Sequence, residues 1–359
     1  MRILHVLYTP RAEGTVRIAL DWLAQPAAAH EVLVLCPRPA ELTAELRQAA
    51  ASYQELPGLP AGPGKFPWLV SKVWAACRRR RPDMVICWPN GFAPWVLLGA
   101  RLAGVRRLVT HAGNPPTSSL SGRLQTFVST FAAWACGGRM VCCSRYVASE
   151  FARSPGAFPS VLRVVYNCAP AERIAREAAE ARLGRSDRRP RLIMVATLEG
   201  HKDHATLLRA MPQVLREVPD AQLWLAGDGS LRAQLTSLKE SLGLGDAVEF
   251  LGSQRDIPRL LGQSDLFVFS TTPEEGLGTV LVEALAAGLP IVATDVPACR
   301  ELLEGGRWGR LVPAAQPQAL ARAVVDALGR RSAAPEDRSA FLQQFTPTRM
   351  IEAYVQATA

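Results

Sequence analysis

Short apolar runs alternate with longer amphipathic segments along most of the chain. Runs of this kind are typical of strands buried on both faces of a parallel sheet, and the segments between them have the apolar spacing of helices. In the first half the predicted strands are 3–8, 31–36, 83–87, 107–110, 140–143 and 162–166. In the second half they are 191–198, 222–229, 247–252, 265–270 and 290–294. The alternation predicts an α/β protein with doubly wound parallel sheets.

The pattern is interrupted once, by a polar and charge-rich segment at 171–190. A length of 359 residues also fits two domains better than one. We therefore predict a Rossmann-like domain at 1–170, a linker with a short helix at 171–190, and a second Rossmann-like domain at 191–345. A last helical pattern occupies 346–359.

The stretch at 273–295, PEEGLGTVLVEALAAGLPIVATD, joins two of the predicted strands. It begins with a glycine-containing loop and continues as an apolar helix over 279–287. Gly288 can end this helix in a left-handed conformation, and Pro290 stands at a strand start. The loop follows the carboxyl end of a strand, which is where open α/β sheets bind their ligands.

Two carboxylates mark this stretch. Glu275 is on the loop, and Glu283 follows on a helix that otherwise contains Val, Leu and Ala. A carboxylate in such surroundings needs hydrogen-bond partners, which a sugar diol can supply. We expect neither residue to be part of the hydrophobic core.

The loop around Glu275 also has features of a phosphate site. Gly276 and Gly278 flank Leu277 and let the backbone come close to a ligand. Thr279 begins the helix, where free N–H groups and the helix dipole favour an anion.

The run resembles the motif of family 4 retaining glycosyltransferases of the GT-B fold, in which a Glu is followed by Gly-x-Gly and, eight positions on, by a second Glu. The competing interpretation is a βαβ unit with two ordinary surface acids. The resemblance implies two Rossmann-like domains that face a central cleft, with the acceptor in the first and a nucleotide-sugar in the second. It also implies that the last helix crosses back to the N-terminal domain.

The resemblance assigns roles to individual residues of the second half. Glu275 would hold the hydroxyls of the transferred sugar and Glu283 the ribose diol. Lys202, which follows a predicted strand and precedes a helix, would bind the diphosphate together with the loop residues 276–279. The family has an Arg five positions before this Lys, where this chain has Thr197.

Other candidate residues lie after neighbouring strands. The resemblance places Gly227 and Asp228, in LAGDGS, on the cleft wall near the donor. In the first half only Gly14 of a common glycine pair is present, because the preceding position is Glu13. His111, in THAGNPP, would orient the sugar by a hydrogen bond, or act as a general acid or base if its pKa fits.

Several function classes lack their motifs. The dinucleotide fingerprint is missing after the first strand, and Gly64-Lys65 does not complete a phosphate-binding P-loop. There is no Asp-x-Asp pair, so we expect no metal and no separate cofactor. His201 and His204 are interpreted as loop and helix-surface residues. No basic stretch interleaved with aromatic residues indicates nucleic acid.

Cysteine usage and hydropathy bear on location. The eight cysteines show no Cys-x-x-Cys spacing and several lie in apolar runs, which favours reduced, buried thiols and a cytoplasmic protein. No run approaches the roughly 20 apolar residues of a membrane span.

Positive charge is concentrated in the first half of the chain. The net charge is +9, and residues 1–170 contain 19 Lys and Arg against 8 Asp and Glu, or +11. The segment 65–81 mixes Trp68 and Trp74 with four adjacent arginines, 78–81. Such a segment is either a peripheral anchor on an anionic inner membrane leaflet or a helix that packs on the sheet with a solvated arginine run.

The resemblance therefore implies that the chain is a retaining glycosyltransferase, and the missing Asp-x-Asp pair adds the expectation that it is metal-independent. It would move a sugar from a nucleotide-sugar to a glycan or lipid-linked acceptor, as in surface polysaccharide or glycolipid assembly. A nucleotide-sugar epimerase and a non-catalytic nucleotide-sugar-binding protein stay open as alternatives.

Overall fold

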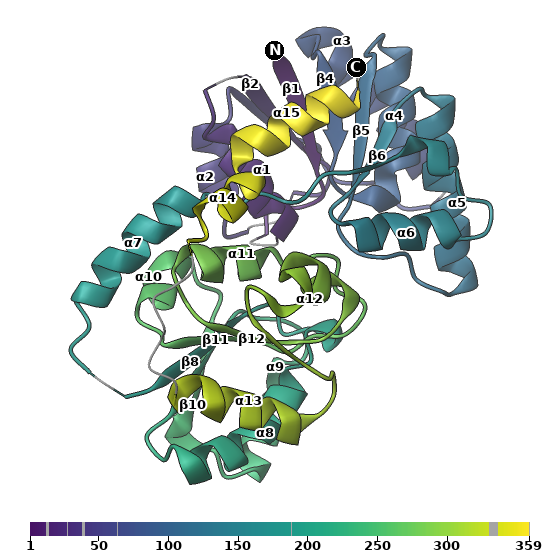
Figure 1. Ribbon diagram of the computed structural model, residues 1–359. Coiled ribbons are helices and arrows are strands. Elements are labelled where there is room, and N and C mark those ends of the chain that lie inside the picture. The colour runs from purple at the N-terminus through teal and green to yellow at the C-terminus, as the bar shows by residue number, and fades with distance from the viewer. Residues whose placement is uncertain are drawn as a thin grey trace. The chain divides into compact units, whose positions relative to one another are not determined.

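The computed structural model describes residues 1–11, 14–26, 28–37, 40–62, 64–187, 189–329 and 337–358. They form two compact units (Figure 1). Unit 1 contains Met1–Cys168 and the C-terminal residues from Pro347 onward, and unit 2 contains Ala169–Thr346.

Unit 1 alternates strands and helices, as the hydropathy pattern predicts. Its strands are β1 (Arg2–Leu7), β2 (Ala29–Val34), β3 (Ser52–Glu55), β4 (Met84–Cys87), β5 (Arg107–Ala112), β6 (Arg139–Cys142) and β7 (Leu162–Val164). Its helices are α1 (Gly14–Leu23), α2 (Thr43–Ala49), α3 (Lys65–Arg80), α4 (Ala93–Leu102), α5 (Leu120–Ala135), α6 (Arg145–Arg153) and α15 (Pro347–Ala357), with short 3-10 turns η1 (Asn90–Phe92) and η2 (Pro159–Val161).

The strands of unit 1 form a parallel sheet in the order β3-β2-β1-β4-β5-β6-β7. The strand order reverses between β1 and β4, and such a switch point is where open sheets of this type bind ligands. Helices α3, α4 and α5 pack in one layer, and α1 and α15 lie together in another (Figure 1). On the α1 side the core is closed by α15, whose Tyr354 ring meets Trp22 edge-on at 4.9 Å.

Unit 2 repeats the architecture. Its strands are β8 (Arg191–Val195), β9 (Gln222–Ala226), β10 (Val248–Gly252), β11 (Leu266–Phe269), β12 (Ile291–Thr294) and β13 (Arg310–Val312). Its helices are α7 (Ala171–Leu183), α8 (His204–Glu217), α9 (Arg232–Ser241), α10 (Ile257–Gly262), α11 (Thr279–Ala286), α12 (Pro297–Leu302), α13 (Pro317–Gly329) and α14 (Ser339–Leu342), with 3-10 turns η3 (Gly200–Lys202), η4 (Gly245–Ala247), η5 (Glu304–Gly306) and η6 (Gln343–Phe345).

The sheet of unit 2 is also parallel, in the order β10-β9-β8-β11-β12-β13. Its switch point lies between β8 and β11. All four residues of β11 and of β12 are buried, as expected for central strands covered on both faces. The fold class predicted from the sequence, two doubly wound parallel α/β domains, is confirmed.

The segment predicted as a linker is largely structured. Helix α7 belongs to unit 2, where it packs against α10 and α11. The carbonyl of Ala178 is so close to Gly262 that a side chain there would collide with it. Arg182 donates to the carbonyl of Ala287 at 2.9 Å. Because α7 is rich in charged residues, its buried face, which includes Ile174 and Ala178, was not predicted from the sequence.

Two strands were not predicted, and one was predicted too short. Strands β3 and β13 are edge strands of four and three residues, and β3 has the polar sequence SYQE, so neither has the apolar run of a central strand. Strand β5 continues two residues further than the predicted 107–110, so His111 is in the strand and not in the following loop.

Candidate functional site

The loop between β11 and α11 holds Glu275 by its own backbone. The Oε1 atom of Glu275 accepts hydrogen bonds from the N–H groups of Gly276 at 3.1 Å and Gly278 at 3.2 Å. The backbone N–H of Glu275 in turn donates to the carbonyl of Thr272 at 3.1 Å. The carboxylate is therefore fixed at the carboxyl end of β11, beside the switch point of the sheet.

Lys202 reaches the same place from the neighbouring strand. Its Nζ atom donates to Oε2 of Glu275 and lies 5.5 Å from the centre of the Phe269 ring. The turn that carries Lys202 is tied to the end of β11, because the carbonyl of His201 accepts from Thr271 Oγ1 at 2.7 Å and from the N–H of Thr272 at 3.0 Å. The ammonium and the carboxylate form a nearly buried ion pair between residues that are 73 positions apart in the chain.

The pair controls the protonation of Glu275. Burial by itself would raise the pKa of this carboxyl, but the nearby Lys202 ammonium and the hydrogen bonds to the carboxylate outweigh it, and the pKa lies below its ordinary value. Glu275 is therefore ionised at neutral pH. An ammonium has three donors, and Glu275 occupies one of them.

The helix after the loop begins beside this pair. Gly278 caps α11 at φ +75°, a conformation that favours glycine, and it has no side chain to cover the first turn. Leu277 is fully buried and anchors the loop, while Thr279 is half-buried at the first helical position. Glu283 is half-buried in the second turn of the same helix. The N-terminus of α11 and both predicted acids thus belong to one loop-helix element.

A second wall comes from the loop after β9. Gly227 passes so close to the carbonyl of Ala196 that any side chain would collide with it. The carbonyl of Asp228 accepts from the N–H of Leu198 at 3.1 Å, and the Asp228 side chain is exposed. These contacts place Gly227 and Asp228 next to the loop after β8, which leads to Lys202.

Two expectations for this region are wrong. Glu275 was expected outside the core, but only 5% of the residue is exposed, because its loop folds over the carboxylate to donate to it. His204 is not a helix-surface residue, because it begins α8 on the side that faces the core and is buried. Burial lowers the pKa of His204 to about 4, so its ring is neutral at pH 7. Thr197, at the position of the expected Arg, is half-buried in the loop after β8.

In unit 1, His111 lies near the carboxyl end of β5, close to the start of α1. Its Nδ1 atom is 2.8 Å from the hydroxyl of Tyr354 on α15, a contact that spans 243 positions of the chain. Its Nε2 atom is buried without a hydrogen-bond partner in the described structure. A side chain at Gly113 would meet this Nε2 atom at 3.4 Å and Thr15 at 3.9 Å, so the ring faces the first turn of α1.

Burial lowers the pKa of His111 to about 4, so the imidazole is neutral at pH 7. In one of the two tautomers open to this pair, the Tyr354 hydroxyl donates to Nδ1 and the ring proton is on Nε2. His111 then presents one N–H donor toward the carboxyl edge of the sheet. Gly14 begins α1 at the same edge, whereas Glu13 lies outside the described residues.

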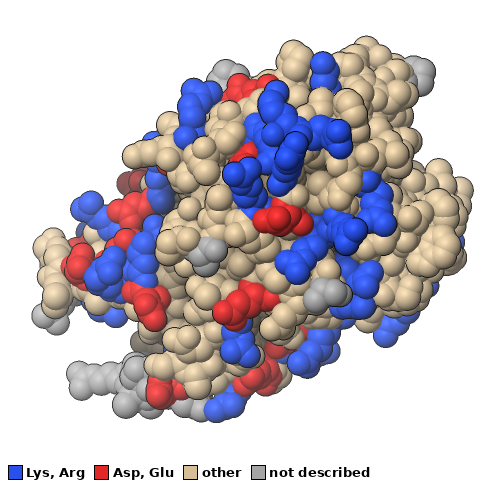
Figure 2. Space-filling view, turned by 90° about the horizontal axis from the view of Figure 1, so that it is seen from above, with Lys and Arg blue, Asp and Glu red and all other residues tan. Residues whose placement is uncertain are grey.

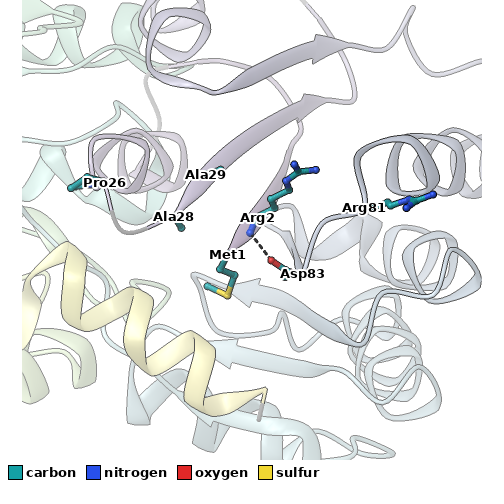
Figure 3. Close-up of a pocket in the computed structure, with 7 residues that line it drawn as sticks. All are labelled: Met1, Arg2, Pro26, Ala28, Ala29, Arg81 and Asp83. Carbon is teal, nitrogen blue, oxygen red and sulfur yellow. Dashed lines mark hydrogen bonds between the residues drawn. The ribbon is translucent and has the colours of Figure 1, made fainter.

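Neither the contact of Tyr354 nor the Lys202–Glu275 pair could be predicted, because both contacts join segments that are distant in the chain. A hollow at the opposite edge of the unit 1 sheet includes none of the predicted catalytic or donor-binding residues (Figure 3). It is lined by Met1, Arg2, Pro26, Ala28, Ala29, Arg81 and Asp83. Within the described ranges, no three His, Cys, Asp or Glu side chains are grouped as a metal site would require.

Comparisons with known proteins agree with this arrangement. The family described as Glycosyltransferase Family 4 matches residues 12–173, and the family described as Glycosyl transferases group 1 matches residues 189–330. The crystal structure of Anabaena HepE in complex with UDP-glucose superposes with a TM-score of 0.83 at 20% identity, covering 99% of this chain and 98% of that one.

Two relatives are mycobacterial enzymes. A phosphatidyl-myo-inositol mannosyltransferase of Mycobacterium tuberculosis is 38% identical over 135 residues, which cover 36% of this chain and only 34% of that relative. A GDP-mannose-dependent alpha-(1-6)-phosphatidylinositol monomannoside mannosyltransferase of Mycolicibacterium smegmatis is 28% identical over 350 residues, or 91% of this chain and 89% of the relative.

The two parallel sheets, each with candidate residues at the carboxyl ends of its strands, define a two-domain protein of the GT-B fold. The chain belongs to the family 4 glycosyltransferases.

Proposed function

We propose that this protein is a retaining glycosyltransferase that moves a sugar from a nucleoside-diphosphate sugar to a hydroxyl of a glycan or lipid-linked acceptor. The observation that carries the proposal is the Lys202–Glu275 pair at the switch point of unit 2, beside the N-terminus of α11. It combines a diphosphate-binding cation, an anion-favouring helix end and a fixed carboxylate within one loop cluster.

The chemistry follows from the charges. When the bond between the sugar and the diphosphate breaks, negative charge develops on the leaving oxygen. Lys202 and the first-turn N–H groups of α11 stabilise this charge, so the step needs no metal and no cofactor. Gly276 and the backbone of Leu277 bring the loop close to the phosphates, and Thr279 adds a hydroxyl at the helix start.

The two carboxylates position the sugar and the ribose of the donor. Glu275 is ionised and accepts hydrogen bonds from the sugar hydroxyls, and Glu283 accepts from the ribose diol. Gly227 and Asp228 form the wall of the donor site, and Gly14 lets the first turn of α1 approach the donor. His111 donates from Nε2 to the transferred sugar. As a neutral donor with a pKa of about 4, it orients the sugar and does not act as a general acid at pH 7.

The donor base and the acceptor are proposed from the relatives. The Mycolicibacterium relative is named for GDP-mannose and the Anabaena structure contains UDP-glucose, so both bases are candidates. The phosphatidylinositol acceptors in the mycobacterial names support a lipid-linked acceptor. We place the protein in the cytoplasm, at the inner face of the membrane in which such an acceptor is anchored.

Incubation with UDP- and GDP-sugars and a membrane extract tests the proposal. Mass spectrometry should detect an acceptor whose mass increases by one sugar, and NMR of the product should show the anomeric configuration of the donor. Glu275→Gln should abolish the product, whereas Glu274→Gln, at the exposed neighbouring acid, should retain it. A donor sugar that changes without acceptor would instead identify an epimerase, and nucleotide-sugar binding without turnover would identify a binding protein.

A further inference from the structure

Helix α5 of unit 1 exposes a row of large apolar side chains. At about 100° per residue, the five apolar positions 120, 124, 127, 131 and 134 lie within an arc of about 80° on one side of the helix. Their exposed fractions range from 40% to 84%. We call this row the apolar stripe; it consists of Leu120, Leu124, Phe127, Phe131 and Trp134.

The opposite face of α5 carries the small residues. The buried positions are Gly122, Thr126, Ser129, Thr130 and Ala133. A surface helix of a globular domain normally shows the reverse, with its large apolar side chains toward the core. Helix α5 is therefore amphipathic in the opposite sense, and its apolar stripe faces away from the domain.

The rotation of α5 is fixed by close contacts. The helix passes so near Thr117 that any side chain at Gly122 would collide with it. On the same face, Thr130 Oγ1 accepts from the backbone N–H of Phe158 at 3.2 Å. Turning the helix to bury the stripe would break the hydrogen bond from Phe158 to Thr130 and expose the small buried face, so the exposure of the stripe is part of the fold.

The apolar surface extends beyond the helix. Phe158 packs beside the stripe, with its ring centre 5.5 Å from that of Trp134 and 5.6 Å from that of Phe131. Helix α4 packs against α5 and exposes Leu98 and Leu102. The aromatic rings of the stripe and Phe158 form one contiguous apolar cluster, and an exposed apolar patch of this kind marks an interaction site.

The charges around this surface indicate the partner. Residues 84–168 contain eight arginines, no lysine and one acid, Glu150, a net charge of +7. That acid is paired with Arg153 at 2.6 Å. Arg123 is exposed on α5 beside the stripe, and Arg101 is close enough to Cys136, at the end of α5, to affect its pKa. On the face in Figure 2, Lys and Arg side chains gather near the centre with a few Asp and Glu among them, and a broad area without charge lies beside them.

We propose that the apolar stripe of α5 is a docking surface for an anionic lipid bilayer. Leu, Phe and Trp side chains enter the interface between headgroups and acyl chains, and Arg123 and Arg101 attract anionic lipid. Among the helices of the described residues, none is long and apolar enough to cross a membrane. The attachment is therefore peripheral, and it brings unit 1 to the surface in which the proposed acceptor is anchored.

This assignment moves the membrane-binding surface away from the segment 65–81. Helix α3 packs its apolar face on the domain, and Arg80 is buried, where it donates to Glu31 at 3.0 Å and Gln54 at 3.0 Å. The four adjacent arginines therefore do not form one exposed basic face.

Co-sedimentation of the full chain with vesicles tests the proposal. The protein should sediment with vesicles of phosphatidylglycerol and phosphatidylethanolamine, and less with phosphatidylcholine or at high salt. The double variant Leu124→Gln, Phe131→Gln should bind about tenfold or more weakly. Arg123→Gln should bind about fivefold more weakly. Leu183→Gln is the matched control, because Leu183 is 89% exposed but lies on α7 of unit 2, and it should bind as the wild type.

Each other outcome overturns the proposal. Wild-type protein that stays in the supernatant with anionic vesicles at low salt would do so, as would equal binding by the stripe variant. Stripe-dependent self-association in sedimentation velocity, without vesicle binding, would make the stripe an interface between copies of this chain. The lipid location rests on the proposed function, but vesicle binding does not: Glu275→Gln should sediment with vesicles like the wild type while it forms no product.

Discussion

The Lys202–Glu275 pair can be measured by a double-mutant cycle on the free energy of unfolding. Lys202→Met removes the charge and keeps most of the stem, and Glu275→Gln keeps an acceptor for the N–H groups of Gly276 and Gly278. The side chains are 16% and 6% exposed. Breaking such a pair by removing one partner costs about 3–5 kcal/mol, because a buried charge loses its compensation.

The two single variants should differ. Lys202→Met leaves a buried carboxylate, so we expect a loss near the lower end of that range, about 3 kcal/mol. Glu275→Gln leaves an ammonium that water can partly reach, so we expect about 1–3 kcal/mol. The double variant has no buried charge and should be more stable than the sum of the single losses implies, with a coupling of at least about 1 kcal/mol.

Urea unfolding of the full chain, followed by tryptophan fluorescence and circular dichroism, gives the four free energies. Calorimetry with UDP and GDP on the same variants separates the two roles of Lys202. Loss of a charge-assisted phosphate contact should weaken nucleotide binding by about 10- to 100-fold in Lys202→Met. Additive stabilities, with a coupling below about 0.5 kcal/mol, would show that the pair does not form in the folded protein and would refute the geometry from which the site is built.

The pH dependence of the cycle provides a second check. The pKa of Glu275 is lower in the folded chain than in the unfolded one, so the pair stabilises fully above the ordinary pKa of a glutamate. That contribution is lost as the pH falls through the lowered folded value. The difference in unfolding free energy between the wild type and Glu275→Gln should therefore be constant from pH 7 to 5 and fall only at more acidic pH. A difference that decreases already between pH 7 and 6 would contradict the lowered pKa.

The remaining predictions concern the other site residues. Tyr354→Phe removes the hydrogen bond to His111 and should lower kcat by about 2- to 10-fold with little change in the KM of the donor, since one neutral hydrogen bond contributes about 0.5–1.5 kcal/mol; an unchanged kcat would show that the contact is only structural. Thr197→Arg should preserve or tighten nucleoside diphosphate binding, by up to about tenfold, and weaker binding in calorimetry would reject the assignment of this position to the phosphates. His111 and His204 have pKa values of about 4 in the folded chain, below the value of about 6.5 in the unfolded chain, so the unfolded chain binds more protons between these two values. The free energy of unfolding should therefore fall on acidification from pH 6.5 to 4, by up to about 1.4 kcal/mol per pH unit for each histidine. Replacing both by Gln should make the free energy of unfolding, measured in denaturant titrations, less dependent on pH. EDTA should leave the transfer rate unchanged, and inhibition reversed by a divalent cation would contradict metal-independent transfer.

The chain's own pattern was sufficient for the architecture. Central parallel strands are buried on both faces, so they appear as apolar runs, and the runs before Lys202 and Glu275 both correspond to strands, β8 and β11. The helix after Glu275 also follows from local chemistry, since it begins after Gly278 at φ +75° and is followed by Gly288 at φ +78°. What is local in the chain, namely periodicity and the conformations that glycine permits, could be predicted.

Burial and pairing could not be predicted, because they depend on which distant segments meet. The carboxylate of Glu275 is buried only because its own loop folds over it and Lys202 arrives from the adjacent strand. His111 is held by Tyr354, from the last helix of the chain. The apolar stripe of α5 has an ordinary amphipathic pattern in the sequence, since a helical period indicates that two faces differ but not which one is covered. Only the packing of the small-residue face, where Thr130 Oγ1 accepts from the N–H of Phe158, decided that the large apolar side chains face outward.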